Sequence, residues 1–376
     1  MNTQPRKRCR DLGIFIGSLP PGEKNSITDI RGVRVGHTTL YYEDERGVAR
    51  TGVTAIWPGD GDLVREPVPI GSFVLAGFGE ITGRTAADDW GIASTPIVLT
   101  ATMSVGIVYH AVQRYLCQRN PELGRLELVI PLVGECDDSF LNDSRAFHIT
   151  AEHVYAALDN ASDAPVEEGC VGAGTGMQCF DFKGGIGSAS RITDPAAGSF
   201  TVGVLVQTNF GKRARLTING APVGSHIPDL LPEGRFPDYW GEDGDGGSCI
   251  VVTATDAPLT THQLAKLARR SALGLARMGS IGANSSGELM LAFSTANRIR
   301  TGGTLANKIE TLNDRRIDAI YQAAIEATEE AVVNALFMAQ TTVGRDGNTL
   351  HALPIDRTLE ILRRYGHPHA TTREGA

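Results

Sequence analysis

The amino-acid sequence predicts a layered α/β fold in which β-sheets are covered by helices. Short apolar stretches rich in β-branched residues alternate with a few segments of helical periodicity. The 376 residues include 44 glycines, which is typical of tight strand connections and close backbone approaches. No internal repeat, low-complexity tract or long linker divides the chain, so we expect one compact domain over residues 1–376.

Eight segments have the composition and length of strands. They are residues 32–41, 52–57, 72–78, 97–101, 126–133, 199–208, 248–255 and 288–293. Two of them, SFTVGVLVQT and CIVVTAT, are apolar and β-branched on both faces. This pattern is typical of a strand that is covered on both sides.

Four segments have helical periodicity, namely residues 104–118, 148–158, 262–278 and 314–340. The third follows the capping candidates Thr260 and Thr261 and ends near Gly279, so we expect a packing helix. The fourth carries a long apolar stripe, and we expect Glu329 and Glu330 to lie on its solvent-exposed face.

The charge balance argues against nucleic acid and anionic membranes as partners. The chain has 35 Lys and Arg against 43 Asp and Glu, a net charge of -8, and therefore no broad positive field. No stretch approaches about eighteen uninterrupted apolar residues, and no apolar region of a secretory signal follows the basic N-terminal segment. We therefore expect a cytoplasmic protein with a small-molecule or peptide partner.

The sequence contains no convincing metal or cofactor motif. The six cysteines form no C-x-x-C pair and no Cys/His cluster at zinc-ligand spacing. The glycine-rich stretches 172–177 and 184–188 lack the third glycine of the dinucleotide fingerprint, and no P-loop motif occurs. The acidic loop 243–247 resembles the start of a calcium loop but lacks the third oxygen ligand and the final glutamate. We expect neither a metal nor any other cofactor.

Polar residues lie at three strand ends. Asn209 follows TVGVLVQT, Ser248 begins CIVVTAT, and Ser286 and Glu288 precede LMLAF. Each of them is also compatible with an ordinary turn or strand-edge position. No G-x-S-x-G motif lies between a strand and a helix, and the histidines lie in no triad-like setting, so a conventional serine hydrolase is not indicated.

The Gly247–Ser248 step allows a different serine chemistry. If this bond is cut, the new α-amine has a reference pKa of about 7.7–8.0 and can act as a base at neutral pH. One residue then supplies both the nucleophilic hydroxyl and the base, and no histidine is needed.

Seven ordered blocks extend this interpretation to the whole chain. They are RDLGI-x10-NSITDIRGVRVGHTTL (10–40), TGVTAI (51–56), GAGTGM-x4-FKGGIGSASR (172–191), TVGVLVQTNFG (201–211), GSCIVVTATDAPL (247–259), LARRSALGLARMG (267–279) and GRDGNTLHALP (344–354). Together they resemble the L-aminopeptidase/D-amidase/D-esterase family, which includes the β-peptidyl aminopeptidases. Long blocks in a fixed order are far more specific than any short motif.

This resemblance implies a four-layer αββα sandwich, related in layout to the N-terminal nucleophile hydrolases and similar to ornithine acetyltransferase. It also implies a precursor that cleaves itself into an α chain of about 1–247 and a β chain of about 248–376. The two chains stay together, and the processed units form a homo-oligomer. Glycine at position 247 permits the strained backbone that attack by Ser248 on the preceding carbonyl requires.

The resemblance also assigns roles to individual residues. Ser248 matches the nucleophile, and Asn209 matches the asparagine that helps bind the oxyanion. Ser286 and Glu288 match residues beside the nucleophile, which would orient its amine and relay a proton. Glu135 matches the carboxylate that receives the free amino group of the substrate.

One position departs from the family's pattern. The family commonly has a tyrosine two residues after the glutamate that Glu135 matches, whereas this chain has Asp137. An ionised aspartate cannot donate a hydrogen bond to an oxyanion. Asp137 is therefore protonated in the site, turned away from it, or bound to a cationic part of a different substrate.

The leading hypothesis is a self-cleaving aminopeptidase or amidase that acts on short peptides or amino acid amides with a free amine. β-Amino acyl and D-amino amide or ester substrates both fit this description. One alternative is an acyltransferase that resembles ornithine acetyltransferase, although those enzymes use threonine where this chain has Ser248. The other is a binding protein that has lost self-processing, in which Asp137 disables the site.

Overall fold

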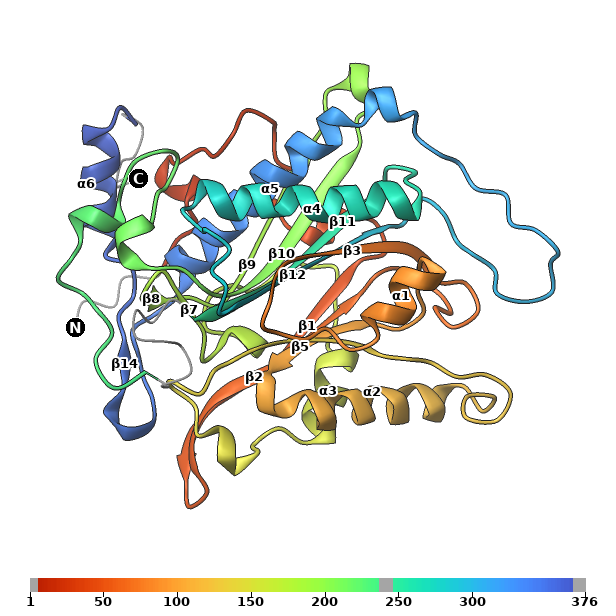
Figure 1. Ribbon diagram of the computed structural model, residues 1–376, viewed down its shortest axis with the longest axis horizontal. Coiled ribbons are helices and arrows are strands. Elements are labelled where there is room, and N and C mark those ends of the chain that lie inside the picture. Colours follow the sequence, from red (N-terminus) through yellow and green to blue (C-terminus); the bar gives the residue numbers. More distant parts are fainter. Residues whose placement is uncertain (1–5, 237–245, 368–376) are drawn as a thin grey trace.

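Two β-sheets packed face to face form the centre of the protein (Figure 1). The computed structural model describes residues 6–236 and 246–367, so Asp243 and Asp245 of the acidic loop lie outside the described residues. The larger sheet has the strand order β4-β3-β12-β11-β10-β9 and the smaller one the order β1-β2-β5-β6. Neighbouring strands are antiparallel except in the pairs β11–β12 and β5–β6.

The strands have the following bounds. The larger sheet contains β3 (Val68–Gly77), β4 (Ile92–Ala93), β9 (Ile186–Ile192), β10 (Thr201–Asn209), β11 (Gly247–Thr255) and β12 (Ser286–Ser294). The smaller sheet contains β1 (Arg34–Asp44), β2 (Gly47–Trp57), β5 (Ile97–Ala101) and β6 (Leu132–Cys136). Two small hairpins are formed by β7 (Gln178–Cys179) with β8 (Phe182–Lys183) and by β13 (Thr342–Val343) with β14 (Thr349–Leu350).

Helices cover the outer face of each sheet. Helices α4 (Thr261–Arg277) and α5 (Asp318–Met338) lie on the larger sheet, and α2 (Val105–Arg119) and α3 (Ala151–Asp159) lie on the smaller one (Figure 1). The shorter helices are α1 (Arg84–Trp90), beside β3, and α6 (Ile355–Arg364), near the C-terminus. The order helix, sheet, sheet, helix confirms the predicted αββα sandwich.

The apolar residues of β11 show how the sequence builds these layers. Ile250 and Val252 point between the two sheets, where they pack with residues such as Leu99 of β5. Cys249 and Val251 point to the other side and pack with helices α4 and α5. Because successive side chains on a strand alternate between its faces, a central strand of this fold is apolar at every position. The prediction that CIVVTAT is covered on both sides is confirmed.

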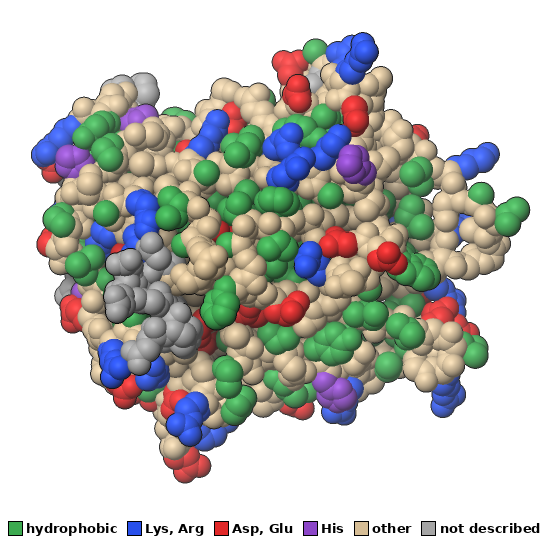
Figure 2. All heavy atoms as spheres, viewed as in Figure 1, with side chains coloured by type: hydrophobic (Ala, Val, Ile, Leu, Met, Phe, Trp, Pro, Cys, Tyr) green, Lys and Arg blue, Asp and Glu red, His purple; other side chains and the backbone are tan. Residues whose placement is uncertain are grey.

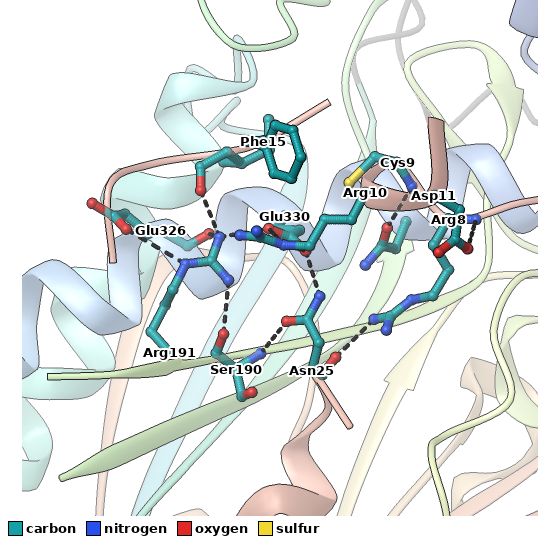
Figure 3. Close-up of polar contacts among 12 residues, drawn as sticks. Arg8, Cys9, Arg10, Asp11, Phe15, Asn25, Ser190, Arg191, Glu326 and Glu330 are labelled. Carbon is teal, nitrogen blue, oxygen red and sulfur yellow. Dashed lines mark hydrogen bonds and ion pairs between the residues drawn. The ribbon is translucent and has the colours of Figure 1, made fainter. Parts of the chain in front are cut away.

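Helix α5 differs from its predicted character. Glu329 and Glu330 are only 5% and 0% exposed, so the prediction that they form a solvent-exposed face was wrong. The N-terminal segment of the chain lies beside Glu330 and brings Arg10 to it (Figure 3). Glu329 instead pairs with Arg277 of α4. A helical pattern with polar residues on one side does not distinguish water from buried arginines as their partners.

The buried charges of α5 belong to a cluster that we call the Arg191 network, which consists of Arg10, Asn25, Arg191, Glu326 and Glu330 (Figure 3). Arg191 rises from β9 to lie 2.6 Å from Glu330 and 3.4 Å from Glu326. Arg10 lies 2.7 Å from the same Glu330 carboxylate, and Asn25 donates to it at 2.5 Å. The network therefore ties the N-terminal segment and β9 to α5.

Two predicted elements begin later than expected. The predicted strand 126–133 begins only at Leu132, because the preceding segment forms turns in which Leu126 and Leu128 are exposed. The predicted helix 314–340 begins as a short 3-10 turn at Asp314 and becomes α-helical at Asp318. Among the described residues, no helix is both long and apolar enough to cross a membrane.

Acidic and basic side chains are interspersed over the face of the protein shown in Figure 2. Neither sign of charge forms a continuous field on this face. This distribution agrees with the balanced composition of the sequence.

Candidate active site

Ser248 and Asn209 lie opposite each other on two central strands of the larger sheet, at the end where those strands begin and finish. Strand β10 ends at Asn209, and the antiparallel register with β11 places Ser248 directly opposite to it. Asn209 Nδ2 donates to Ser248 Oγ at 3.3 Å and to the carbonyl oxygen of Asp137 at 2.9 Å. Both side chains are buried, with 1% and 4% exposure. The structure therefore brings the predicted nucleophile and oxyanion donor within hydrogen-bond distance.

A hydrogen bond to its oxygen fixes the orientation of the Asn209 side-chain amide. Its Oδ1 accepts a hydrogen bond of 3.2 Å from the backbone N–H of Gln178. Gln178 belongs to the β7–β8 hairpin, which is held by Lys183. The buried ammonium of Lys183 donates to the carbonyl oxygens of three backbone groups at 2.8–3.1 Å, those of Met177, Gly184 and Gly174. Burial lowers the pKa of Lys183. Sequence reasoning missed Gln178 and Lys183, although both lie within or next to the block FKGGIGSASR.

Glu135 is a buried carboxylate at the end of β6. Its Oε1 accepts from the backbone N–H of Glu80 at 2.8 Å, and its Oε2 accepts from the hydroxyl of Thr102. Burial raises the pKa of Glu135, and the two hydrogen bonds oppose this shift. The carboxylate is thus held rigidly in a position that favours an incoming cation.

Asp137 follows two residues later and has its carboxylate turned toward its own loop. Asp137 Oδ1 accepts from the backbone N–H of Ser139 at 3.0 Å, and Oδ2 accepts from the Ser139 hydroxyl at 2.9 Å. The side chain thus stabilises the turn after β6. Of the three arrangements left open by the sequence, this geometry favours a carboxylate that is turned away from Asn209.

A cleft of about 620 Å³ connects these groups. The residues that line it are Gly77, Phe78, Gly79, Thr102, Met103, Glu135, Asp137, Ser139, Ser144, Arg145, Gly247, Ser248, Ser285 and Arg345. The cleft is large enough for a short peptide or an amino acid amide. It places the buried carboxylate of Glu135 and the hydroxyl of Ser248 on one continuous surface.

Ser286 and Glu288 lie on the neighbouring strand but outside this cleft. In the parallel register of β12 with β11, Ser286 is opposite Gly247 and Glu288 is opposite Cys249. Their side chains therefore share the helix-covered face with Cys249, whereas Ser248 points toward the smaller sheet. With Ser280 they line a separate cavity of about 10 Å³, which is room for about one water molecule.

Glu288 is incompletely satisfied in this cavity. Ser280 Oγ donates to its Oε1 at 3.0 Å. Among the described residues, neither Glu288 Oε2 nor Ser286 Oγ has a hydrogen-bond partner. Burial raises the pKa of Glu288, and the neighbouring hydroxyls of Ser280 and Ser286 oppose this shift.

Gly247 is required here by a close approach. A Cβ at this position would lie 2.5 Å from the carbonyl oxygen of Asn209, well inside van der Waals contact. Gly247 is not among the glycines with positive φ, so the backbone that it adopts is not the strained one expected from the sequence. The glycine instead allows β10 and β11 to pack closely at the proposed scissile bond.

Comparison with known proteins identifies the family of this chain. Residues 25–350 match Peptidase family S58. The chain belongs to this family. The β-peptidyl aminopeptidase BapA of Sphingosinicella microcystinivorans is 42% identical over 372 residues, which cover 95% of this chain and 92% of that protein.

Two solved structures show that the similarity extends to the fold. The β-aminopeptidase of a Burkholderia species is 42% identical, with a TM-score of 0.87 and coverage of 96% of this S58 chain and 99% of that chain. The L-aminopeptidase D-Ala-esterase/amidase of Ochrobactrum anthropi is 39% identical, with a TM-score of 0.88 and coverage of 97% and 99%. That enzyme is described as a prototype of the serine aminopeptidases and as a variant of the N-terminal nucleophile hydrolase fold.

These findings confirm the predicted family and class of activity. The S58 chain is a hydrolase of the serine aminopeptidase type. The acyltransferase alternative is not favoured. Within the described part of the chain, no group of three or more His, Cys, Asp or Glu residues is arranged to hold a metal ion.

Proposed function

We propose that this S58 aminopeptidase cuts its own chain between Gly247 and Ser248 and then uses Ser248 to release the first residue of short peptides. The observation that carries this proposal is the contact between Asn209 Nδ2 and Ser248 Oγ in a cleft that also holds the carboxylate of Glu135. A nucleophile, an oxyanion donor and an ammonium-binding group are the parts that an aminopeptidase of this kind requires.

Self-processing would begin with attack of Ser248 Oγ on the carbonyl carbon of Gly247. The amide C–N bond breaks as the new ester C–O bond forms, and the nitrogen of Ser248 becomes a free amine. Water then hydrolyses the ester, which leaves a carboxylate on Gly247 and restores the serine hydroxyl. The product chains, residues 1–247 and 248–376, would stay together because β10 pairs with β11 and because the Arg191 network joins them.

Turnover would use the same hydroxyl with the new amine as its base. The amine takes the proton of Ser248 Oγ while the oxygen attacks the substrate carbonyl. Asn209 Nδ2 stabilises the negative charge that develops on the carbonyl oxygen. The protonated amine then gives its proton to the leaving nitrogen, and water hydrolyses the acyl-enzyme. Glu288 and Ser286 would hold the amine in position from the neighbouring strand.

Substrate selection would rest on Glu135. Its carboxylate is buried and already fixed by two hydrogen bonds, so it can pair with the ammonium group of a substrate without reorganising. Because the similar enzymes of Sphingosinicella and Burkholderia are a β-peptidyl aminopeptidase and a β-aminopeptidase, we propose β-amino acyl peptides as the preferred substrates. D-Amino amides and esters are a second class suggested by the Ochrobactrum relative.

Several expectations from the sequence stay predictions. They are assembly into a homo-oligomer of processed units, a cytoplasmic location, the lack of nucleic acid and membrane partners, and activity without a cofactor.

The test is intact-mass measurement and N-terminal sequencing of the purified protein, alongside Ser248→Ala and Ser225→Ala. Ser225 is an exposed serine whose hydroxyl donates to Pro222, and it serves as a matched control. We expect a fragment that begins at Ser248 in the wild type and in Ser225→Ala, together with hydrolysis of a β-alanyl anilide. Ser248→Ala should remain a single inactive chain. A wild type that stays uncut after long incubation would overturn the proposal and favour a processing-deficient binding protein.

A further inference from the structure

Two arginines line the same cleft and have no part in the mechanism above. Arg145 lies in the 3-10 turn Ser144–Ala146, and Arg345 begins the turn Arg345–Gly347. We propose that these two side chains form a subsite for the α-carboxylate of the residue that leaves. The preferred substrates are then short peptides that end in a free carboxylate one residue beyond the scissile bond. This inference rests on the proposed function and narrows its substrate class.

The guanidinium of Arg345 is held in place but keeps binding capacity. Its Nε donates to the carbonyl oxygen of Ser139 at 2.6 Å, and its Nη1 pairs with Asp346 at 2.8 Å. Among the described residues, Nη2 has no hydrogen-bond partner. Asp346 is 74% exposed, so water screens its charge and the pair is weak.

The guanidinium of Arg145 has still more hydrogen-bond donors available for a ligand. Its side chain makes no hydrogen bond or ion pair with any of the described residues. The preceding residue, Ser144, is fixed by a hydrogen bond of 3.1 Å to the buried carboxylate of Asp138, which anchors the turn at the cleft. A guanidinium presents five N–H donors in a fork that matches the two oxygens of a carboxylate. Both arginines line the same cleft, and each can contribute such donors to an anion bound there.

The contacts of residues 135–139 relate Glu135, the reacting centre and Arg345 to one another. Glu135 lies at the amine end, the carbonyl of Asp137 contacts Asn209 at the reacting centre, and the carbonyl of Ser139 contacts Arg345. Asn209 therefore contacts the chain between Glu135 and the carbonyl group that holds Arg345. This order along residues 135–139 is the one in which a residue after the scissile bond can bring its carboxylate to the arginines.

The cleft carries charges opposite to those at both ends of such a peptide. Glu135 can pair with the substrate ammonium and the two arginines with its carboxylate, whereas the carboxylate of Asp137 is bound to Ser139. An amino acid amide or anilide offers only the first charge. A peptide with a free C-terminus offers both, so its orientation across Ser248 is fixed at two points.

The experiment compares three β-alanyl substrates that differ in the position of the carboxylate. They are β-alanyl-leucine, its C-terminal amide, and β-alanyl-glutamic acid α-amide, in which only the side chain is acidic. In the wild type at low salt, we expect kcat/KM for the free acid to exceed that for the leucine amide by about tenfold or more, as for a hydrogen bond to a charged group. The side-chain acid should not share this advantage. A preference for the side-chain acid alone would overturn the proposal for a terminal carboxylate.

Variants then assign the preference to the arginines. Arg145→Gln and Arg345→Gln should each lower the ratio of acid to amide, and the double variant should bring it near one. Arg345→Gln also loses the bond to Ser139, so Arg145→Gln, which breaks no contact among the described residues, is the decisive variant. Arg300→Gln is the control, because that arginine is 70% exposed and lies outside the cleft. It should keep the wild-type ratio.

The outcomes separate this inference from the proposed function. If the amide is hydrolysed by the Ser248 enzyme but the acid has no advantage, the carboxylate subsite is wrong and the proposed function stands. A ratio that is unchanged in Arg145→Gln and in the double variant also overturns the subsite. If neither peptide is cut and no fragment begins at Ser248, both the proposed function and the carboxylate subsite are wrong.

Discussion

The Arg191 network offers the sharpest test of how the protein is held together. Glu330 of α5 receives Arg191 at 2.6 Å, Arg10 at 2.7 Å and Asn25 at 2.5 Å, and its side chain is fully buried. Replacing it with glutamine keeps the shape but removes the charge that both guanidinium groups share. Breaking a buried ion pair by neutralising one partner typically costs about 3–5 kcal/mol, because the remaining charge is left uncompensated. We expect a loss of this size for Glu330→Gln.

The loss is measurable as a shift in the melting temperature. With an unfolding entropy of about 2.1 cal/mol/K per residue, a chain of this length should lose roughly 4–6 °C in Tm by calorimetry at pH 7. Glu329→Gln is the matched control, because Glu329 is its neighbour on the same helix and, among the described residues, its one ion pair is with the half-exposed Arg277 at 3.2 Å. Burial outweighs this pairing and raises the pKa of Glu329, so folding does not favour its charged form. We therefore expect that variant to change stability by no more than about 1 kcal/mol.

The stability that Glu330 contributes should depend on pH in one direction. Burial acts to raise the pKa of Glu330, but Arg191 and Arg10 outweigh it and hold the pKa below its usual value of 4.5. A lowered carboxylate pKa contributes stability that is fully present above about pH 4.5 and is lost as the pH falls through the folded-state pKa. The difference in Tm between wild type and Glu330→Gln should therefore shrink in acid. Equal Tm values for Glu330→Gln and Glu329→Gln at pH 7 would refute the reasoning.

Four further variants test the residues of the cleft and those that support them. Asn209→Ala should lower kcat by about 10²–10³-fold, the usual cost of one oxyanion donor, and a loss in KM alone would argue against this role. Glu135→Gln should raise KM for substrates with a free amine by about tenfold or more, since it removes a charged hydrogen-bond partner. Because burial raises the pKa of Glu135, wild-type kcat/KM should fall in acid through a pKa above the usual 4.5, and Glu135→Gln should lack this limb. Lys183→Met should lower kcat more than it raises KM, because it releases the loop that orients Asn209; equal effects on both would indicate a general structural defect. Asp137→Tyr should shift activity toward simple L- or β-amino acyl amides, and unchanged relative rates across a substrate panel would show that the residue has no part in selection.

Much of the fold follows from local sequence patterns. The central strands β10 and β11 were predicted because apolar side chains are required on both of their faces. Strand β9 was missed, because its sequence IGSASRI is rich in glycine and serine, and the polar groups find partners only after folding. Ser188, for example, accepts from the backbone of Ile27 and donates to the backbone of Val204. Helix α6 was also missed, although the periodicity of IDRTLEILRR is a signal that the sequence does contain.

The site was predictable mainly through the family resemblance. Single polar residues at strand ends do not show that Asn209 and Ser248 are partners, because that depends on the register of two strands far apart in the sequence. The hydrogen-bond donors to Glu135 could not be predicted for the same reason, because Glu80 and Thr102 come from separate segments of the chain. The buried position of Glu330 depends likewise on an N-terminal segment more than 300 residues away.

The separation of Glu288 from Ser248 suggests what the proposed self-cleavage would achieve. In the uncut chain the hydroxyl of Ser248 faces the cleft, whereas Glu288 and Ser286 face the helix layer on the other side of the sheet. A carboxylate on one face cannot take a proton directly from a hydroxyl on the other.

The nitrogen of Ser248 lies in the plane of the sheet, between the two faces, but as an amide it is not basic. Cutting the bond to Gly247 turns this nitrogen into an amine with a reference pKa of about 7.7–8.0 and frees it to rotate. It can then contact Ser248 Oγ on one side and Glu288, whose Oε2 lacks a partner among the described residues, on the other.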